Sequence, residues 1–363
     1  MIAGMRLRVA GALVLVAAAC AALVPGLTAW VEQSYSRGCY PVIQRAVTAG
    51  SNAVSFALLD VLLVVVLAVV GLATATVVRA PRGRRWRLLA RRAWHSAVAL
   101  ALAYLVFLGV WGLNYRRLPV SAMLDFDERR VTAETVVALN ETAVAEMARL
   151  RPGLPGRLEA WPDQRRVALE LLPALEKGVR LLGLPEPVRA GRPKTSLLDP
   201  YLTRAGVSGM TDPFFLETLI ASNVLPFEHP SVIGHEWGHL AGLARESDAS
   251  FFGLLVCLHG GEAAQYSAWL DIFVLTLGAR DRDSRRDIRA RLPALVRADL
   301  AAMAERSERD QVRVLSLAAW RTYDTYLRSQ RVGSGVRNYG EVVRLLAGTR
   351  FESGWKPVLR PRD

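Results

Sequence analysis

The chain has 363 residues, 52% of them hydrophobic, and its mean hydropathy of +0.22 is high for a protein that is soluble throughout. A net charge of +13 would suit a nucleic-acid-binding protein if it were spread over a globular domain. It is instead concentrated at the start of the chain, where residues 1–114 carry 11 Arg and no Lys against Glu32 and Asp60. We therefore expect a membrane protein with no nucleic acid among its partners.

Three apolar stretches, residues 9–30, 53–78 and 96–113, are each long enough to cross about 30 Å of hydrocarbon as a helix. The first follows the basic stretch MRLR and could instead be a cleaved signal sequence. In either case residues 1–114 are expected to form a transmembrane region whose partner is the lipid bilayer.

The loop RAPRGRRWRLLARR, between the second and third stretches, carries seven Arg, whereas residues 31–52 carry only Arg37 and Arg45. The positive-inside rule places the more basic loop in the cytoplasm. Residues 115–363 are then expected to form an extracytoplasmic domain, held at the cytoplasmic (inner) membrane by a multi-pass anchor.

One acidic and two tryptophan side chains lie within or beside the predicted spans. Asp60 lies in the second span, where an ionisable group either marks function or sits near the outer interface. Trp94 and Trp111 bracket the third span, and we expect both to act as interfacial anchors.

The second part of the chain shows mostly helical spacing of apolar residues, which predicts a mainly α fold with a short strand region, an α+β class. Residues 206–225 contain glycines, Asp and Pro before a short apolar run and predict a turn and a strand. Residues 251–277 are interrupted by polar residues, so we expect two buried helices joined at glycines and no fourth span. Further helices are predicted over 133–150, 165–182, 285–305 and 311–328, with connections at 151–162 and 183–195.

The stretch VIGHEWGHL, residues 232–240, carries two of the five histidines. Pro230 suits a first helical position and Gly242 the residue just past a helix end, which predicts a helix of about twelve residues. Four residues advance a helix by about 400°, so His235 and His239 share one face and could bind one Zn²⁺. Glu236 lies beside them and could take a proton from a water molecule.

The alternative is a surface helix that carries polar residues by chance. The apolar neighbours Val232, Ile233, Trp237 and Leu240 favour a buried helix instead. Gly238 lowers the helix propensity by about 1 kcal/mol, which suggests that another backbone packs closely there.

A zinc site of this type needs a third protein ligand. Arg245 stands where metzincins place their third histidine, which excludes that geometry. Glu246 follows the turn at Gly242 and is the expected ligand, with Asp248 or Glu262 as the alternatives. If Glu246 is the ligand, Ser250 lies on the same helix face, four residues further on, and could orient a ligating histidine.

These residues resemble those of an uncharacterised bacterial membrane-protein family, a domain of unknown function with N-terminal spans and a gluzincin-like metallopeptidase domain. The shared motifs follow one another in the order WGLNYRRLP, SGMTDPFFLETLIASNVLPFEHPSVIGHE, GLARESDASFFGLLVCL and GVRNYGEVVRLL. The resemblance implies that His235 and His239 are zinc ligands, Glu236 the catalytic base and Glu246 the third ligand. The chain departs from the family pattern at Asp248 and at Ser250, where Asn or Asp is usual.

A donor near the reacting oxygen would complete such a site. Tyr339 is the first candidate, and Tyr323, Tyr326 and His259 are the others. Each has the ordinary alternative of a place in the core or on the surface.

The sequence thus predicts a membrane-anchored zinc metallopeptidase that hydrolyses a peptide or protein substrate held beside residues 214–224. Two alternatives remain open at this point. One is a non-catalytic scaffold or sensor with a structural zinc site, and the other is a zinc hydrolase of a non-peptide amide in the cell envelope.

Overall fold

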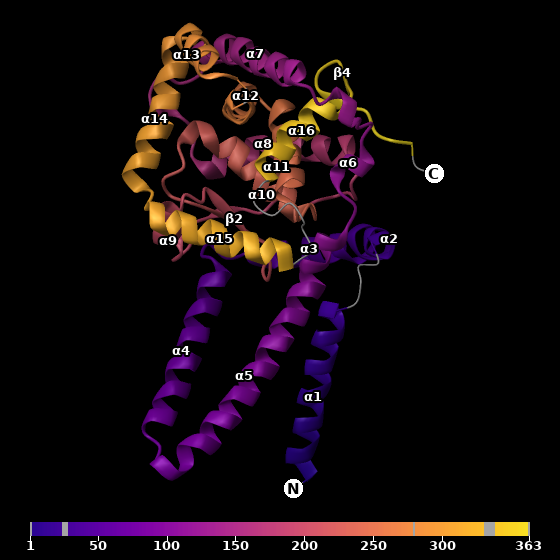
Figure 1. Ribbon diagram of the computed structural model, residues 1–363, viewed down its shortest axis with the longest axis vertical. Coiled ribbons are helices and arrows are strands. Elements are labelled where there is room, and N and C mark those ends of the chain that lie inside the picture. Colours follow the sequence, from indigo (N-terminus) through magenta and orange to yellow (C-terminus); the bar gives the residue numbers. More distant parts are fainter. Residues whose placement is uncertain (1, 24–27, 279, 330–337, 362–363) are drawn as a thin grey trace.

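The computed structural model describes residues 2–23, 28–278, 280–329 and 338–361. Figure 1 shows a large, mainly helical domain from which three long helices extend in one direction. These three helices are long and apolar enough to span a membrane, as the sequence predicts: α1 (Ile2–Leu23), α4 (Leu58–Val78) and α5 (Arg82–Val110).

The membrane helices differ from the predicted spans at their ends. Helix α5 begins at Arg82, so most of the arginine-rich stretch expected as a loop is helical, because Arg, Leu and Ala are good helix formers. Helix α1 packs along α5, where Gly11 leaves room for Trp94 and Val98. Helix α4 meets α5 at their shared turn and diverges from it toward the large domain (Figure 1).

The segment between α1 and α4, expected as a loop, is also helical. It consists of α2 (Thr28–Trp30), the π-helix η1 (Val31–Cys39) and α3 (Tyr40–Asn52). Gln44 is buried, and its amide donates to the carbonyl of Arg189 and accepts from the amide of the same residue, at 2.7 and 3.0 Å. The segment therefore packs as part of the large domain.

The large domain contains the remaining helices. They are η2 (Gly112–Arg116), α6 (Val120–Met123), η3 (Glu128–Arg130), α7 (Ala133–Leu150), η4 (Arg151–Gly153), η5 (Leu158–Ala160), α8 (Gln164–Leu181), α9 (Asp199–Ala205), η6 (Pro226–Glu228), α10 (His229–Leu240), α11 (Glu246–Leu258), α12 (Glu262–Leu277), α13 (Arg282–Arg291), α14 (Ala294–Asp310), α15 (Arg313–Ser329) and α16 (Asn338–Gly348). The helices predicted over 133–150, 165–182 and 311–328 are confirmed as α7, α8 and α15. The single helix predicted over 285–305 is wrong: α13 ends before Pro293, which cannot continue a helix, and α14 begins after it.

The strands form two small sheets. One has the order β1-β3-β2 and contains β1 (Pro193–Lys194), β2 (Gly209–Asp212) and β3 (Glu217–Ile220); the other pairs β4 (Phe351–Glu352) with β5 (Lys356–Pro357). The strand expected within 206–225 is confirmed as the antiparallel pair β2 and β3. Strand β1 lies in a stretch expected as a connection. Because β3 is paired on both sides, β2 is an edge strand of its sheet.

Helix α10 lies at the centre of the domain and packs most closely on α11. Their backbones approach closely at Gly234, Gly238 and Gly253. An added methyl group would lie 3.1 Å from the carbonyl oxygen of Gly253 at Gly234, 2.9 Å from Cα of Ala249 at Gly238, and 2.6 Å from the backbone nitrogen of His235 at Gly253. The close neighbour expected at Gly238 is therefore confirmed. The two helices expected within 251–277 are also confirmed as α11 and α12, which are buried and joined at residues 259–261.

Replacing Gly253 with Ala is expected to lower the free energy of unfolding by roughly 1–3 kcal/mol, because the added methyl group must push α10 and α11 apart. Thermal unfolding in detergent measures the effect. Gly50→Ala, in helix α3, is the matched control, since a methyl group added at Gly50 would meet no neighbouring atom within 4 Å. Equal unfolding temperatures for the two variants would contradict this account of the helix contact.

Candidate metal centre

The motif helix α10 has the predicted limits. It runs from His229 to Leu240, with Pro230 in its first turn, and Gly242 follows it with a φ of +81°. A left-handed residue of this kind ends many helices, and glycine adopts it without steric cost. Ile233, Trp237 and Leu240 are fully buried, so the helix belongs to the core.

Three side chains from α10 and α11 meet at one point. The Nε2 atom of His235 lies 3.2 Å from Oε2 of Glu246, and Nε2 of His239 lies 3.5 Å from Oε1 of the same carboxylate. Ligand atoms from the three side chains all lie within 4.8 Å of one another. Two ligands held tetrahedrally about 2.0–2.1 Å from one zinc ion are about 3.3 Å apart, so these separations suit a shared ion.

The second nitrogen of each imidazole is held by a neighbour. Nδ1 of His239 donates to the carbonyl of Leu243 at 2.8 Å, and Nδ1 of His235 lies 3.0 Å from Oγ of Ser250. The contact of Ser250 with a motif histidine agrees with the expectation from the sequence. Hydrogen bonding at Nδ1 fixes the ring and directs Nε2 toward a ligand, which is the usual arrangement around metal-binding histidines.

The alternative third ligands lie elsewhere. Asp248 is buried on another side of α11, where it accepts from the backbone of Val120, and burial raises the pKa of its carboxyl to about 6. Glu262 is exposed at the start of α12 and lies beside Gly153. Neither belongs to the cluster, so of the three carboxylates considered only Glu246 faces both histidines.

The charges in the cluster reinforce one another. Burial alone raises the pKa of Glu246, but His239 and His235 overcome this effect and hold it well below its usual range. Burial lowers the pKa of His239, yet the charge and hydrogen bond of Glu246 raise it to about 9. Without a metal the cluster therefore holds an anionic carboxylate beside a protonated imidazole.

Glu236 lies next to the cluster and faces strand β2. Burial raises the pKa of its carboxyl, although His235 and His239 act in the opposite direction. Oγ of Thr211 donates to Oε2 of Glu236 at 2.7 Å, and a methyl group at Gly209 would lie 2.6 Å from Oε1. The neighbouring strand is thus β2 and not the 214–224 stretch expected from the sequence, whose strand β3 is covered on both sides.

The C-terminal end of α10 rests on residues near the membrane helices. Trp111, directly after α5, donates from Nε1 to the carbonyl of His239 at 3.1 Å, and the hydroxyl of Tyr40 donates to Leu240 at 2.9 Å. Arg117 donates to the carbonyl of Gly242 at 3.0 Å. Trp111 is only 5% exposed, so its expected role as an interfacial anchor is wrong: its indole N–H satisfies a carbonyl at the helix end instead.

The sequence gives no signal for these supports. Thr211 precedes Glu236 by 25 residues, and Tyr40 is 200 residues from the carbonyl that it binds. Such partners become neighbours only through the tertiary fold.

Of the four candidate donors for the reacting oxygen, only His259 has a side chain within the described residues. The side chains of Tyr339, Tyr323 and Tyr326 lie outside the described residues. His259 follows the last residue of α11, whereas Glu246 is its first, so about 20 Å of helix separates them. His259 is therefore not a neighbour of the cluster.

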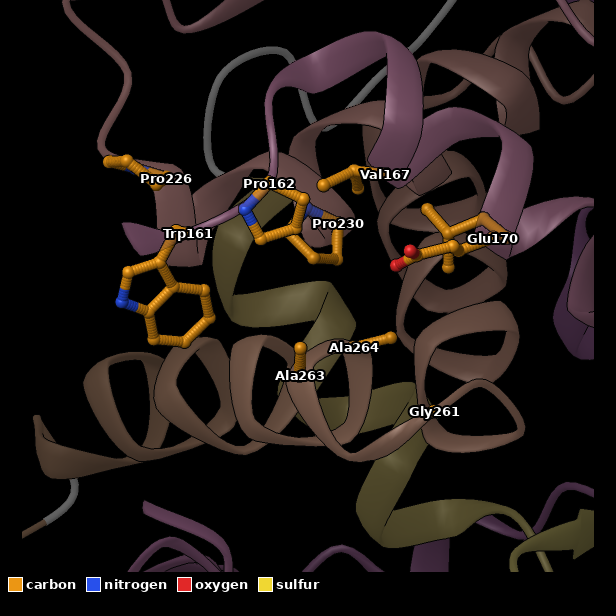
Figure 2. A pocket seen from close by; sticks show the side chains of 10 residues that line it. Trp161, Pro162, Val167, Glu170, Pro226, Pro230, Gly261, Ala263 and Ala264 are labelled. Carbon is orange, nitrogen blue, oxygen red and sulfur yellow. The ribbon is translucent and has the colours of Figure 1, made fainter. Parts of the chain in front are cut away.

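A cavity of about 260 Å³ lies at the opposite end of α10. Figure 2 shows it between Trp161, Pro162 and Pro226 and the start of α12, with Pro230 from the first turn of α10 in its wall. The residues that line the cavity do not include His235, Glu236, His239 or Glu246, so the cavity is separate from the cluster. The cluster itself reaches the surface at His235 and Glu246, whose side chains are 23% and 17% exposed.

Comparison with known proteins identifies the family. A family model described as "Protein of unknown function (DUF3810)" matches residues 35–347, and the chain belongs to this family. No curated protein and no solved structure matches the chain.

We expect zinc to bind this cluster with an affinity that rises with pH. Because the pKa of His239 is about 9 without metal, zinc must displace a proton from it at lower pH. The apparent dissociation constant should fall about tenfold per pH unit between pH 6 and 8. Competition with a chelator measures it on the purified protein.

Glu246→Gln supplies the comparison, since it removes the charge that raises the pKa of His239. Its binding should be weaker by at least about tenfold and less dependent on pH. An unchanged affinity in this variant, or a constant affinity of the parent between pH 6 and 8, would contradict the assignment.

Proposed function

We propose that this member of the DUF3810 family is a membrane-anchored zinc metallopeptidase. His235, His239 and Glu246 would hold the zinc, and Glu236 would act as general base. The observation that carries the proposal is the convergence of two Nε2 atoms on one carboxylate, with a second, buried carboxylate beside them. A structural zinc site needs no general base, so it would not require a second buried carboxylate beside the ligands.

Zinc, when bound, would activate a water molecule and polarise the carbonyl oxygen of a substrate. Glu236 would take a proton from the water and later pass it to the leaving amine. Its raised pKa suits both steps, because a base works best when its pKa lies nearer the working pH. Thr211 holds Oε2 and so fixes the orientation of the carboxylate.

Strand β2 offers a place for the substrate backbone. In this antiparallel pair, every second residue of β2 directs its N–H and C=O groups toward β3. The N–H and C=O groups of the residues between them point toward the unpaired edge. An extended peptide added along this edge would pass beside Glu236, since Gly209 and Thr211 both touch that side chain.

The proposed side of the membrane rests on the distribution of charge. The turn between α4 and α5, the arginine-rich start of α5 and the start of α1 lie at the end of the membrane helices away from the large domain (Figure 1). By the positive-inside rule this end is cytoplasmic, and the metal centre lies outside.

Glu236→Gln is expected to keep the zinc and reduce peptide cleavage by about 10²–10⁴-fold, because the amide cannot accept the proton. Thr211→Val should have a smaller effect, as it frees the carboxylate without removing it. Zinc content and the rate of cleavage of a peptide library, both measured on purified protein, test the two variants.

Glu262→Gln is the control, because Glu262 is exposed and distant from the cluster. It should match the parent in both measurements. Parental cleavage by Glu236→Gln would exclude this mechanism and favour a structural site.

A further inference from the structure

The metal centre is fixed at a short distance from the membrane by the end of α5. The ring of Trp111, one residue past α5, lies 6.0 Å from the ring of His239 and donates to its carbonyl. Glu236 is one helical turn further along α10, which adds about 5 Å. The proposed base therefore lies roughly 10–15 Å from the end of a membrane helix.

A second attachment fixes the sheet to α4. The carboxylate of Glu217 on β3 accepts from the amides of Leu58 and Leu59, the first residues of α4, at 3.0 and 3.1 Å. Lys194 on β1 donates to the same carboxylate at 2.5 Å, and both side chains are fully buried. Moving the sheet away from α4 would leave this buried carboxylate without its two amide donors, which is costly, so these bonds hold the sheet at the start of α4.

Asp60 strengthens this attachment. Oγ of Ser196 donates to Oδ1 of Asp60 at 2.5 Å, and the amide of Leu197 donates to Oδ2 at 2.9 Å. Asp60 is thus close to the domain end of its helix and binds the loop that follows β1.

The hairpin of β2 and β3 reaches the level of the membrane helices themselves. The ring of Phe214, between the strands, lies 6.4 Å from that of Phe107, within α5. Met210 of β2 packs in one apolar cluster with Leu62 and Leu63 of α4. The edge strand beside Glu236 therefore lies at the domain end of the membrane helices, between the diverging ends of α4 and α5 (Figure 1).

Exposed apolar side chains occur at the same level. Phe56 precedes α4 and is 53% exposed, and Leu197, whose amide binds Asp60, is 70% exposed. Such side chains on a membrane protein suit contact with the lipid interface. With α4 and α5 in a bilayer, the face of the domain that holds β2 would lie toward the bilayer surface.

We infer that the substrates are polypeptides anchored in the same membrane, cut a few residues outside their own membrane segment. The inference rests on the proposed peptidase function. An extended chain advances about 3.3 Å per residue, so the distance of 10–15 Å corresponds to about three to five residues beyond the level at which α5 ends. A substrate held in the bilayer also approaches β2 at a high effective concentration.

The test uses a library segment of about ten residues in three settings: directly outside a single membrane span, beyond a Gly/Ser spacer of about forty residues, and as a free peptide. Full-length enzyme and the anchored forms are reconstituted in the same lipid vesicles. Cleavage directly outside the span should be at least tenfold faster than in the other two settings, and Glu236→Gln should abolish it.

The outcomes separate this inference from the proposed function. Equal, Glu236-dependent rates in all three settings would overturn the inference and leave the peptidase assignment intact. Absence of Glu236-dependent cleavage in every setting would remove both.

Discussion

The close contact between α10 and α11 determines the rest of the site. Without a side chain at Gly234, Gly238 and Gly253, the two backbones approach until a methyl group would no longer fit. The turn at Gly242 reverses the chain, and α11 then starts with Glu246 opposite His235 and His239. Interiors packed at this density resist small shifts, so the three side chains remain close together without a long connecting loop.

The sequence predicts the local part of this arrangement well. The limits of α10, the shared face of its histidines and the turn at Gly242 follow from helical periodicity and from the preferences of Pro and Gly. Glu246 follows from its place after the turn. All of these features depend on residues within about fifteen positions of one another, where spacing determines geometry.

The remainder could not be predicted from local patterns. Nothing in the local sequence distinguishes Thr211 from the other threonines, and it contacts Glu236 only because β2 packs on α10. Trp111 is a tryptophan at the end of a predicted span, as an interfacial anchor would be, yet its indole N–H donates to the carbonyl of His239 near the end of α10. The segment 31–52 lacks an apolar run, and its helices are stabilised by buried polar contacts such as that between Gln44 and Arg189, which lie 145 residues apart. The arginine-rich stretch expected as a loop is largely helical, because a pattern of charge bears on membrane sidedness and not on backbone conformation.

The membrane helices and the metal centre form one structural unit in this account, because α5 supports the end of α10 and α4 supports the sheet. The central claim is that His235, His239 and Glu246 share one zinc ion. X-ray absorption at the zinc edge of the purified, full-length protein tests it most directly. The account predicts one zinc per chain with two imidazole nitrogens and further oxygen ligands at about 2.0–2.1 Å. A protein that binds no zinc, or a spectrum with thiolate sulfur in place of imidazole, would contradict it.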